Sequence, residues 1–275
     1  MHKLEIIQKI LNKIIKNTRN IWLFFLDFIF PRECFGCGQE GDWLCQTCFH
    51  KINFKQTQYC LNCKQENEFG QFCPDCKGQY ELDGVWIAFV YEEELITKLV
   101  KSLKYNFIKE LANELSQYLI LFINNLINQS RLTAIDLSEG VNWQSFTKTK
   151  NLPNVILDFK QSIIIPVPLA KKRLRWRGFN QAEMLARGLT DHFRLDLGLN
   201  QLVRIKHRKP QAKLNEKQRK TNLKDCFTWQ GNDLAKRNVI LIDDVVTTGS
   251  TLNECANVLK ANGAGEVWGL VISKG

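Results

Sequence analysis

Short apolar runs rich in Val, Ile and aromatic side chains recur along this chain and predict β-strands. Polar or turn-forming residues bound each run, as is typical of short strands buried in a sheet. The predicted strands cover residues 85–91, 163–165, 239–242 and 267–272.

Apolar residues spaced three or four positions apart predict helices over residues 1–30, 92–126 and 251–261. Asn180, with Glu183 three residues later, has the pattern of a capping box and predicts that another helix begins there. Helical segments therefore follow each of the first three predicted strands.

Strand and helix signals alternate from residue 162 onward. This alternation predicts an α/β fold, a parallel sheet with helices on both faces. Residues 128–154 are polar and match neither pattern, so we expect a surface insertion at about 128–160. The expected parts are an N-terminal amphipathic helix (1–30), a cysteine-rich segment (31–80) and a larger α/β domain (81–275).

Charge is unevenly distributed along the chain. The 275 residues hold 38 Lys and Arg against 28 Asp and Glu, a formal net charge of +10. Residues 161–230 hold sixteen Lys and Arg and five Asp and Glu, so this segment carries +11 and the remainder −1. We expect an anionic ligand near this segment, although a solvated basic face has the same composition.

No apolar run approaches the ~18 residues that span a bilayer. Residues 21–30 are the longest candidate, but Asp27 interrupts them and no small-residue cleavage site follows. We therefore expect a cytoplasmic protein. The basic helix predicted at residues 1–30 suits either a peripheral position at the inner face of the membrane or packing against its own protein.

Eight of the ten cysteines form four C-x-x-C pairs. This spacing lets both sulfurs reach one ion, and two pairs complete a tetrahedral Zn–S₄ site. Without an export signal the thiols stay reduced, which favours metal over disulfides. Two zinc sites are expected, paired sequentially or interleaved. The predicted ligands are Cys34, Cys37, Cys45, Cys48, Cys60, Cys63, Cys73 and Cys76.

The cysteine-rich segment has few apolar residues for a core, so we expect zinc to supply its folding free energy. It then serves only as a structural staple, or also as a contact surface for nucleic acid or a partner. Cys226 and Cys255 lie apart from the pairs and are expected to be buried thiols in the larger domain.

The most specific motif follows the strand predicted at residues 239–242. Asp243 and Asp244 come at its carboxyl end, the edge at which parallel sheets bind ligands. A hydroxyl-rich turn containing Gly249 then leads into a helix whose free N–H groups and dipole favour a phosphate. The two carboxylates suit ribose hydroxyls, bound directly or through Mg²⁺. The stretch lacks the Walker A lysine and the G-x-G-x-x-G pattern, so it is neither of these loops.

This motif resembles the phosphoribosyl-pyrophosphate (PRPP) signature of type I phosphoribosyltransferases. With the cysteine pairs and further motifs, the chain is similar to the ComF family of ComFC-like competence proteins over roughly residues 28–127 and 161–274. The further motifs are Pro166-Val167-Pro168-Leu169, Arg173, Arg177-Gly178-Phe179-Asn180-Gln181-Ala182, and Gln211-Ala212 with Arg219 and Asn222. The resemblance implies a type I phosphoribosyltransferase-like domain preceded by a double zinc ribbon.

The resemblance also implies roles for matching positions. Asp243 and Asp244 hold the ribose, with Mg²⁺ at the pyrophosphate, and Arg173 binds the departing pyrophosphate; these three are the implied catalytic residues. Residues 208–222 correspond to a mobile loop. Purine-salvage relatives usually carry an acid where Thr247 stands, so no general base is identified. The implied PRPP-binding positions are Leu169, Ala170, Lys171, Lys172, Arg173, Asp243, Asp244, Val245, Thr247, Thr248, Gly249, Ser250 and Thr251.

Two functions of different class follow. The first is a competence protein in DNA uptake and natural transformation that binds PRPP, contacts single-stranded DNA and works with a ComFA-type helicase. The second is a nucleobase phosphoribosyltransferase of salvage, and a non-catalytic PRPP-binding module is a further alternative. Cations interleaved with aromatic residues suit single-stranded DNA, although the two aromatic residues, Trp176 and Phe179, fit a hydrophobic core equally well. The candidates are Arg175, Trp176, Arg177 and Phe179.

Overall fold

The computed structural model describes residues 31–52, 57–89, 94–135, 158–205 and 226–275, with residues 153 and 156. The chain divides into two compact units, Met1–Ile52 and Asn53–Gly275. The predicted helix at 1–30 and mobile loop at 208–222 lie outside the described residues, as do residues 136–152 of the predicted insertion. Among the helices of the described ranges, none is long and apolar enough to cross a membrane.

Tight turns shape the described part of the first unit. The N–H of Gly38 donates to the carbonyl of Cys34 (2.8 Å), and Gly38 has a φ of +77°. Glycine adopts this left-handed backbone without strain, so the chain reverses directly after its first C-x-x-C pair. Helix α2 (Gln46–Phe49) carries Cys48 of the second pair. The two cysteine pairs of this unit are thereby brought together.

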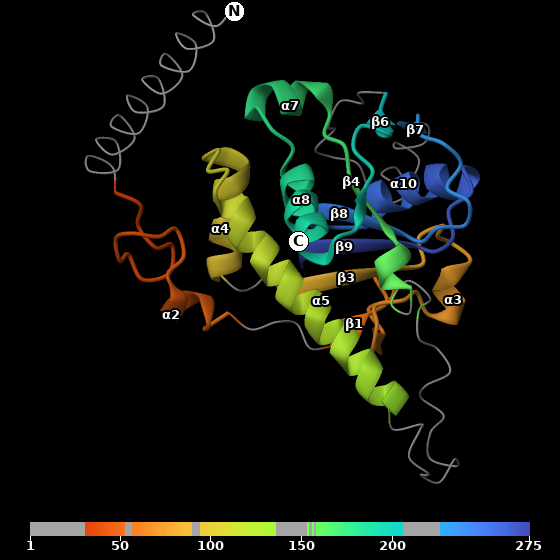
Figure 1. Ribbon diagram of the computed structural model, residues 1–275, viewed down its shortest axis with the longest axis horizontal. Coiled ribbons are helices and arrows are strands. Elements are labelled where there is room, and N and C mark those ends of the chain that lie inside the picture. The colour runs from red at the N-terminus through yellow and green to blue at the C-terminus, as the bar shows by residue number, and fades with distance from the viewer. Residues whose placement is uncertain are drawn as a thin grey trace, which may run out of the picture. The chain divides into compact units, whose positions relative to one another are not determined.

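A parallel five-stranded sheet forms the centre of the second unit (Figure 1). The strand order is β3-β9-β8-β4-β5, with every neighbouring pair parallel, which confirms the predicted α/β fold. Strand β8 runs further than predicted, because its pairing with β9 continues past the acidic residues to Val246. The strands are β3 (Gly84–Phe89), β4 (Ile163–Pro166), β5 (Asp196–Leu197), β8 (Val239–Val246) and β9 (Val267–Lys274).

Two small antiparallel sheets and two short helical segments lie outside the five-stranded sheet. One of these sheets and one helical segment lie in the stretch that carries the second set of cysteines, before β3. The sheets pair β1 (Gln58–Tyr59) with β2 (Glu66–Asn67) and β6 (Leu202–Arg204) with β7 (Phe227–Trp229), and the helical segments are α3 (Pro74–Lys77) and η2 (Phe159–Gln161).

Five further helices pack on the sheet or beside it. α8 contacts β4 and β8, α5 contacts β3 and α8, and α10 contacts β9 and β7. α7 is a short helix. Gly178 follows its last residue with a φ of +78°, a left-handed backbone that ends the helix. The helices are α4 (Glu94–Tyr105), α5 (Leu111–Ile135), α7 (Lys171–Arg177), α8 (Gln181–Phe193) and α10 (Ser250–Ala261).

The single helix predicted over residues 92–126 is wrong in one respect: it is two helices, α4 and α5. Asn106 ends α4 by donating its backbone N–H to the carbonyl of Ser102 (3.0 Å) and its side-chain amide to that residue's hydroxyl (3.2 Å). Phe107 then adopts a left-handed backbone with a φ of +59°, which cannot continue a right-handed helix. Helix α5 continues to Ile135, so the first residues of the predicted polar insertion are helical.

The predicted start of α8 is confirmed, but only half of the predicted capping box forms. The side chain of Asn180 accepts a hydrogen bond from the N–H of Ala182 (3.2 Å), as an N-cap does. The carboxylate of Glu183 instead binds Arg187 one turn later (2.8 Å). An oppositely charged partner at this spacing competes with the return bond to the cap.

Side chains along each strand point alternately to the two faces of the sheet. On one face, Val85, Leu241 and Val271 share a hydrophobic core with residues of α10 and with the second set of cysteines. Trp86 and Trp268 stack at a ring-centroid distance of 5.0 Å and are almost completely buried. The cysteine segment after residue 53 is therefore part of the core of the α/β unit.

Candidate functional site

The cysteines form two separate tetrads, one in each unit. In each, four sulfurs lie within 4.8 Å of one another, and their grouping follows the sequential pairing. The Sγ atoms of Cys37 and Cys45 are 3.6 Å apart, and those of Cys63 and Cys73 are also 3.6 Å apart. A tetrahedral zinc with bonds of ~2.3 Å separates its sulfurs by about 3.8 Å, so both tetrads fit this ion. The interleaved pairing is excluded by this geometry.

In each tetrad, one cysteine has a lowered pKa, which favours its thiolate form. Burial raises the pKa of Cys34, but hydrogen bonds from backbone N–H groups outweigh burial and lower it to about 6. The same balance lowers the pKa of Cys60 to about 7. A hydrogen bond with Cys76 and burial raise the pKa of Cys73 to about 12. A bound dication would remove this cost of deprotonating the thiol. The donor set therefore suits zinc chemically as well as geometrically.

The predicted acidic motif lies at the carboxyl end of β8, followed by α10. Asp244 is buried at 3% exposure, and Asp243 is partly buried. The Asp243 carboxylate accepts the backbone N–H of Asp244 (2.8 Å). The motif thus combines two interacting carboxylates with the beginning of a twelve-residue helix.

Two hydroxyls of the hydroxyl-rich turn contact each other. The hydroxyls of Thr248 and Ser250 lie 2.8 Å apart, while Thr247 is exposed. Gly249 directly precedes α10 with a φ of +74° and is buried. The N–H of Ser250 donates to the Thr248 hydroxyl (3.4 Å). These hydroxyls and the N–H groups that follow in the first turn of α10 give an anion several donors.

Asp244 has a cationic partner that the sequence did not indicate. The ammonium group of Lys104, from the last turn of α4, lies 3.0 Å from one carboxylate oxygen of Asp244. The other oxygen is buried and has no hydrogen-bond partner among the described residues. A buried carboxylate oxygen without a donor is costly. This oxygen is therefore available to a ligand hydroxyl or a cation.

Arg177 lies in the same electrostatic neighbourhood. It is buried at 7% exposure and donates to the side-chain oxygen of Gln181. Burial lowers its pKa, and the charges of Asp244 and Asp243 oppose that effect. Its Nε has no partner among the described residues. Arg177 thus adds a buried cation to the partly buried Lys104 in the electrostatic environment of the acidic pair.

The titration of Asp243 gives a testable pH dependence. Burial and the carboxylate of Asp244 raise its pKa to about 7, from an ordinary value of ~3.9. The folded protein therefore holds this proton more tightly than the unfolded chain, and that contribution to stability disappears as the pH rises from about 4 to about 7. We expect the melting temperature of the wild type to fall relative to that of Asp243→Asn between about pH 5 and about pH 8. Melting curves whose difference stays constant across this range would contradict the assignment.

The segment predicted for pyrophosphate follows β4. Leu169 and Ala170 are partly buried in the turn, while Lys171, Lys172 and Arg173 are exposed in the first turns of α7. The charge of Arg173 lowers the pKa of Arg177, so the two cations influence each other. Arg173 is thereby linked electrostatically, through Arg177, to the acidic pair.

The four residues predicted to contact nucleic acid separate into two pairs. Arg177 and Phe179 are buried, at 7% and 8% exposure, so neither offers a surface for base stacking. Trp176 is 57% exposed, and Arg175 is also exposed. Of the four, Arg175 and Trp176 therefore offer exposed side chains, whereas Arg177 is the buried residue of α7 and Phe179 follows the helix after Gly178.

Trp176 belongs to an exposed aromatic cluster, formed with Tyr105 and Phe107. Its ring centroid lies 5.0 Å from that of Phe107 and 6.2 Å from that of Tyr105. Tyr105 is 59% exposed and Phe107 39%. Tyr105 directly follows Lys104, so the cluster begins beside the residue that pairs with Asp244.

Sequence reasoning missed Lys104, Tyr105 and Phe107. The available signal was weak: two aromatic residues stand at the polar end of an amphipathic pattern. Nothing in their spacing relates them to residue 244.

Two family models match the chain. The double zinc ribbon domain matches residues 25–77, and the phosphoribosyl transferase domain matches residues 177–272. The first match covers both tetrads, and the second covers α8, the acidic motif and α10. The predicted double zinc ribbon and phosphoribosyltransferase fold are thereby confirmed.

The chain is also similar to named proteins over most of its length. It is 32% identical over 234 residues to Competence protein F of Haemophilus influenzae, covering 82% of this chain and 89% of that protein. It is 27% identical over 221 residues to Competence protein ComFC of Bacillus subtilis, covering 80% and 79%. It is 29% identical over 175 residues to DNA utilization protein YhgH of Escherichia coli, covering 63% and 65%.

Proposed function

We propose, because this chain belongs to the ComF family of competence proteins, that it binds PRPP with Mg²⁺ and acts in DNA uptake and natural transformation. The names of its relatives, competence protein and DNA utilization protein, support the process. The ligand is supported by the acidic motif and the phosphoribosyl transferase domain. The single observation that carries the proposal is the buried oxygen of Asp244 that has no hydrogen-bond partner among the described residues, on the strand that leads into α10.

PRPP matches the chemistry of this motif group by group. A ribose offers hydroxyls to the carboxylates of Asp243 and Asp244, and its 5′-phosphate suits the hydroxyls and N–H groups that precede and begin α10. The exposed cations of α7 suit the pyrophosphate. Carboxylate oxygens are ligands that Mg²⁺ prefers, and the ion would neutralise part of the pyrophosphate charge.

In this proposal, side chains of the protein orient the ribose and neutralise the charge of the pyrophosphate. Lys104 pairs with one oxygen of Asp244 and offsets part of the cost of burying this carboxylate, which leaves the other oxygen to accept a ribose hydroxyl. Arg173 would stabilise the negative charge that develops on the pyrophosphate as its bond to C1 lengthens. Thr247 is exposed and offers a hydroxyl, not a carboxylate. This position therefore offers no general base for a purine acceptor.

Calorimetric titration of the zinc-loaded protein with PRPP and Mg²⁺ tests the ligand. We expect heat of binding and a raised melting temperature, because a ligand that binds only the folded state stabilises it. Ribose 5-phosphate and pyrophosphate, titrated separately, each supply part of the contacts and should bind more weakly. No heat and no thermal shift with PRPP would contradict the proposal. Pyrophosphate release with free bases then distinguishes a salvage enzyme from a protein that only binds PRPP.

We further propose that the aromatic cluster of Tyr105, Phe107 and Trp176 contacts single-stranded DNA. Exposed rings accept bases by stacking, and cations on the same surface meet phosphates. Arg175 and Lys172 are exposed on the helix that carries Trp176. A helicase of the ComFA type is the partner that this role implies.

Replacing Trp176 by alanine tests the DNA contact. We expect about tenfold weaker binding of an oligonucleotide, because stacking on one ring contributes ~1–3 kcal/mol. The salt dependence between about 50 mM and about 200 mM should persist, because the cations remain. Leu174→Ala is the matched control, since Leu174 is an exposed apolar residue of the same helix, 42% exposed. Equal loss in both variants, or no DNA binding by the wild type, would contradict the contact.

A further inference from the structure

The second cysteine tetrad is built into the core of the α/β unit. Cys60 and Cys76 are buried and belong to the same hydrophobic cluster as Leu252 and Cys255 of α10. Asn62, between the first two ligands, donates to the Sγ of Cys76 (3.2 Å). Zinc binding at this tetrad therefore fixes atoms that also pack against α10.

Leu61 lies directly against the hydroxyl-rich turn. It stands between Cys60 and Cys63 and is 6% exposed. A Cβ added at Gly249 would lie 2.4 Å from the Cδ2 of Leu61. The backbone of Gly249 thus packs on the Leu61 side chain with no room for a methyl group. The glycine serves this contact as well as the left-handed φ of +74°.

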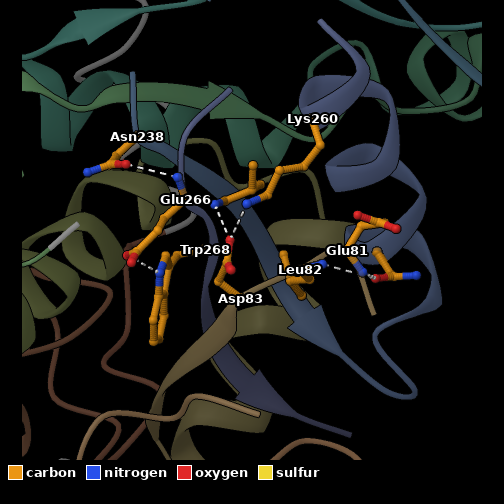
Figure 2. A network of polar contacts seen from close by, with 9 residues as sticks. Glu81, Leu82, Asp83, Asn238, Lys260, Glu266 and Trp268 are labelled. Carbon is orange, nitrogen blue, oxygen red and sulfur yellow. Dashed lines mark hydrogen bonds and ion pairs between the residues drawn. The ribbon is translucent and has the colours of Figure 1, made fainter. Parts of the chain in front are cut away.

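The segment that leaves the tetrad is tied to the same helix at two further places (Figure 2). Near the start of α10, the Asn253 side chain accepts the backbone N–H groups of Glu81 (2.9 Å) and Leu82 (3.2 Å). Near its end, Lys260 pairs with Asp83 (2.8 Å), whose carboxylate also accepts the N–H of Val267 (2.8 Å). The helix is therefore held along its length, and Leu61 holds the residue before its first turn.

We infer that Leu61 is a positioning residue for the turn that precedes α10, and that zinc in the second tetrad holds it in place. Ligation of Cys60 and Cys63 fixes both ends of the short segment that carries Leu61. Leu61 then fixes Gly249, next to the N–H groups that α10 presents to a 5′-phosphate. This inference rests on the proposed function for the identity of the anion, but not for the order of the turn.

Leu61→Ala in the full, zinc-loaded chain tests the inference. We expect hydrogen exchange at the backbone amides of residues 247–252 to become faster and PRPP affinity to fall by about tenfold or more, because a displaced turn no longer aims its donors. Zinc content should stay at two ions per chain. Leu61→Met, which keeps the volume, should restore both properties.

Leu259→Ala is the matched control. Leu259 belongs to the same hydrophobic cluster but lies near the other end of α10, so it should lower stability without changing either readout. If Leu61→Ala does not fold, Leu61→Val makes the same comparison with one carbon removed. Wild-type exchange at residues 247–252 in Leu61→Ala, or in Leu61→Val where the alanine variant does not fold, overturns the inference. Absence of PRPP binding by the wild type instead overturns the proposed function and leaves the exchange test valid.

Discussion

Replacing Cys60 by serine is expected to destabilise the unit of residues 53–275 far more than Cys34→Ser does. Both cysteines are buried, at 0% and 3% exposure; the tetrad of Cys60 shares the core of the parallel sheet, whereas Cys34 belongs to the other compact unit. A structural zinc site contributes several kcal/mol or more to folding. Since ~1 kcal/mol shifts the melting temperature of a domain of this size by ~2–4 °C, we expect Cys60→Ser to lower that of the unit by about 10 °C or more.

Scanning calorimetry combined with hydrogen exchange in β8 and β9 measures this asymmetry. The exchange data report on the sheet itself, so melting of the first unit does not interfere. In Cys34→Ser, zinc content should fall to one ion per chain while β8 and β9 stay protected. If the two variants expose β8 and β9 to the same extent, the second tetrad has no special connection to the sheet core.

The second large effect is expected from replacing Asp243 and Asp244 together by asparagine. Asparagine keeps the shape of both side chains but removes the charges that favour ribose hydroxyls and Mg²⁺. Charge-assisted hydrogen bonds contribute ~1–3 kcal/mol each, so PRPP affinity should fall by tenfold or more. Titration calorimetry with Mg²⁺ present gives the measurement.

A matched control for this variant is Asp196→Asn. The carboxylate of Asp196 also pairs with a basic residue, Arg237 (2.8 Å), but the Asp196 side chain is 71% exposed. We expect PRPP binding to be unchanged there. Wild-type affinity in the double asparagine variant would show that PRPP, if bound, is held elsewhere.

Local patterns were sufficient to predict much of this protein. The strand at β8 and the helix at α10 follow from apolar periodicity, and the parallel sheet follows from strand–helix alternation, because each depends on neighbouring residues. The C-x-x-C pairs predicted their metal in the same way, since a two-residue spacing brings two sulfurs together wherever it occurs. The break between α4 and α5 was missed because apolar spacing continues across Phe107, although its backbone does not.

The sequence by itself determined four strands of the parallel sheet, the eight cysteine ligands and the acidic motif, because short-range spacing defines each of them. Only the tertiary structure showed that Lys104 partners Asp244 and that Leu61 packs on Gly249. It also decided that Trp176 is exposed while Phe179 is buried. These facts depend on how distant segments pack around one core, and the spacing of residues along a chain does not specify which distant side chains will meet.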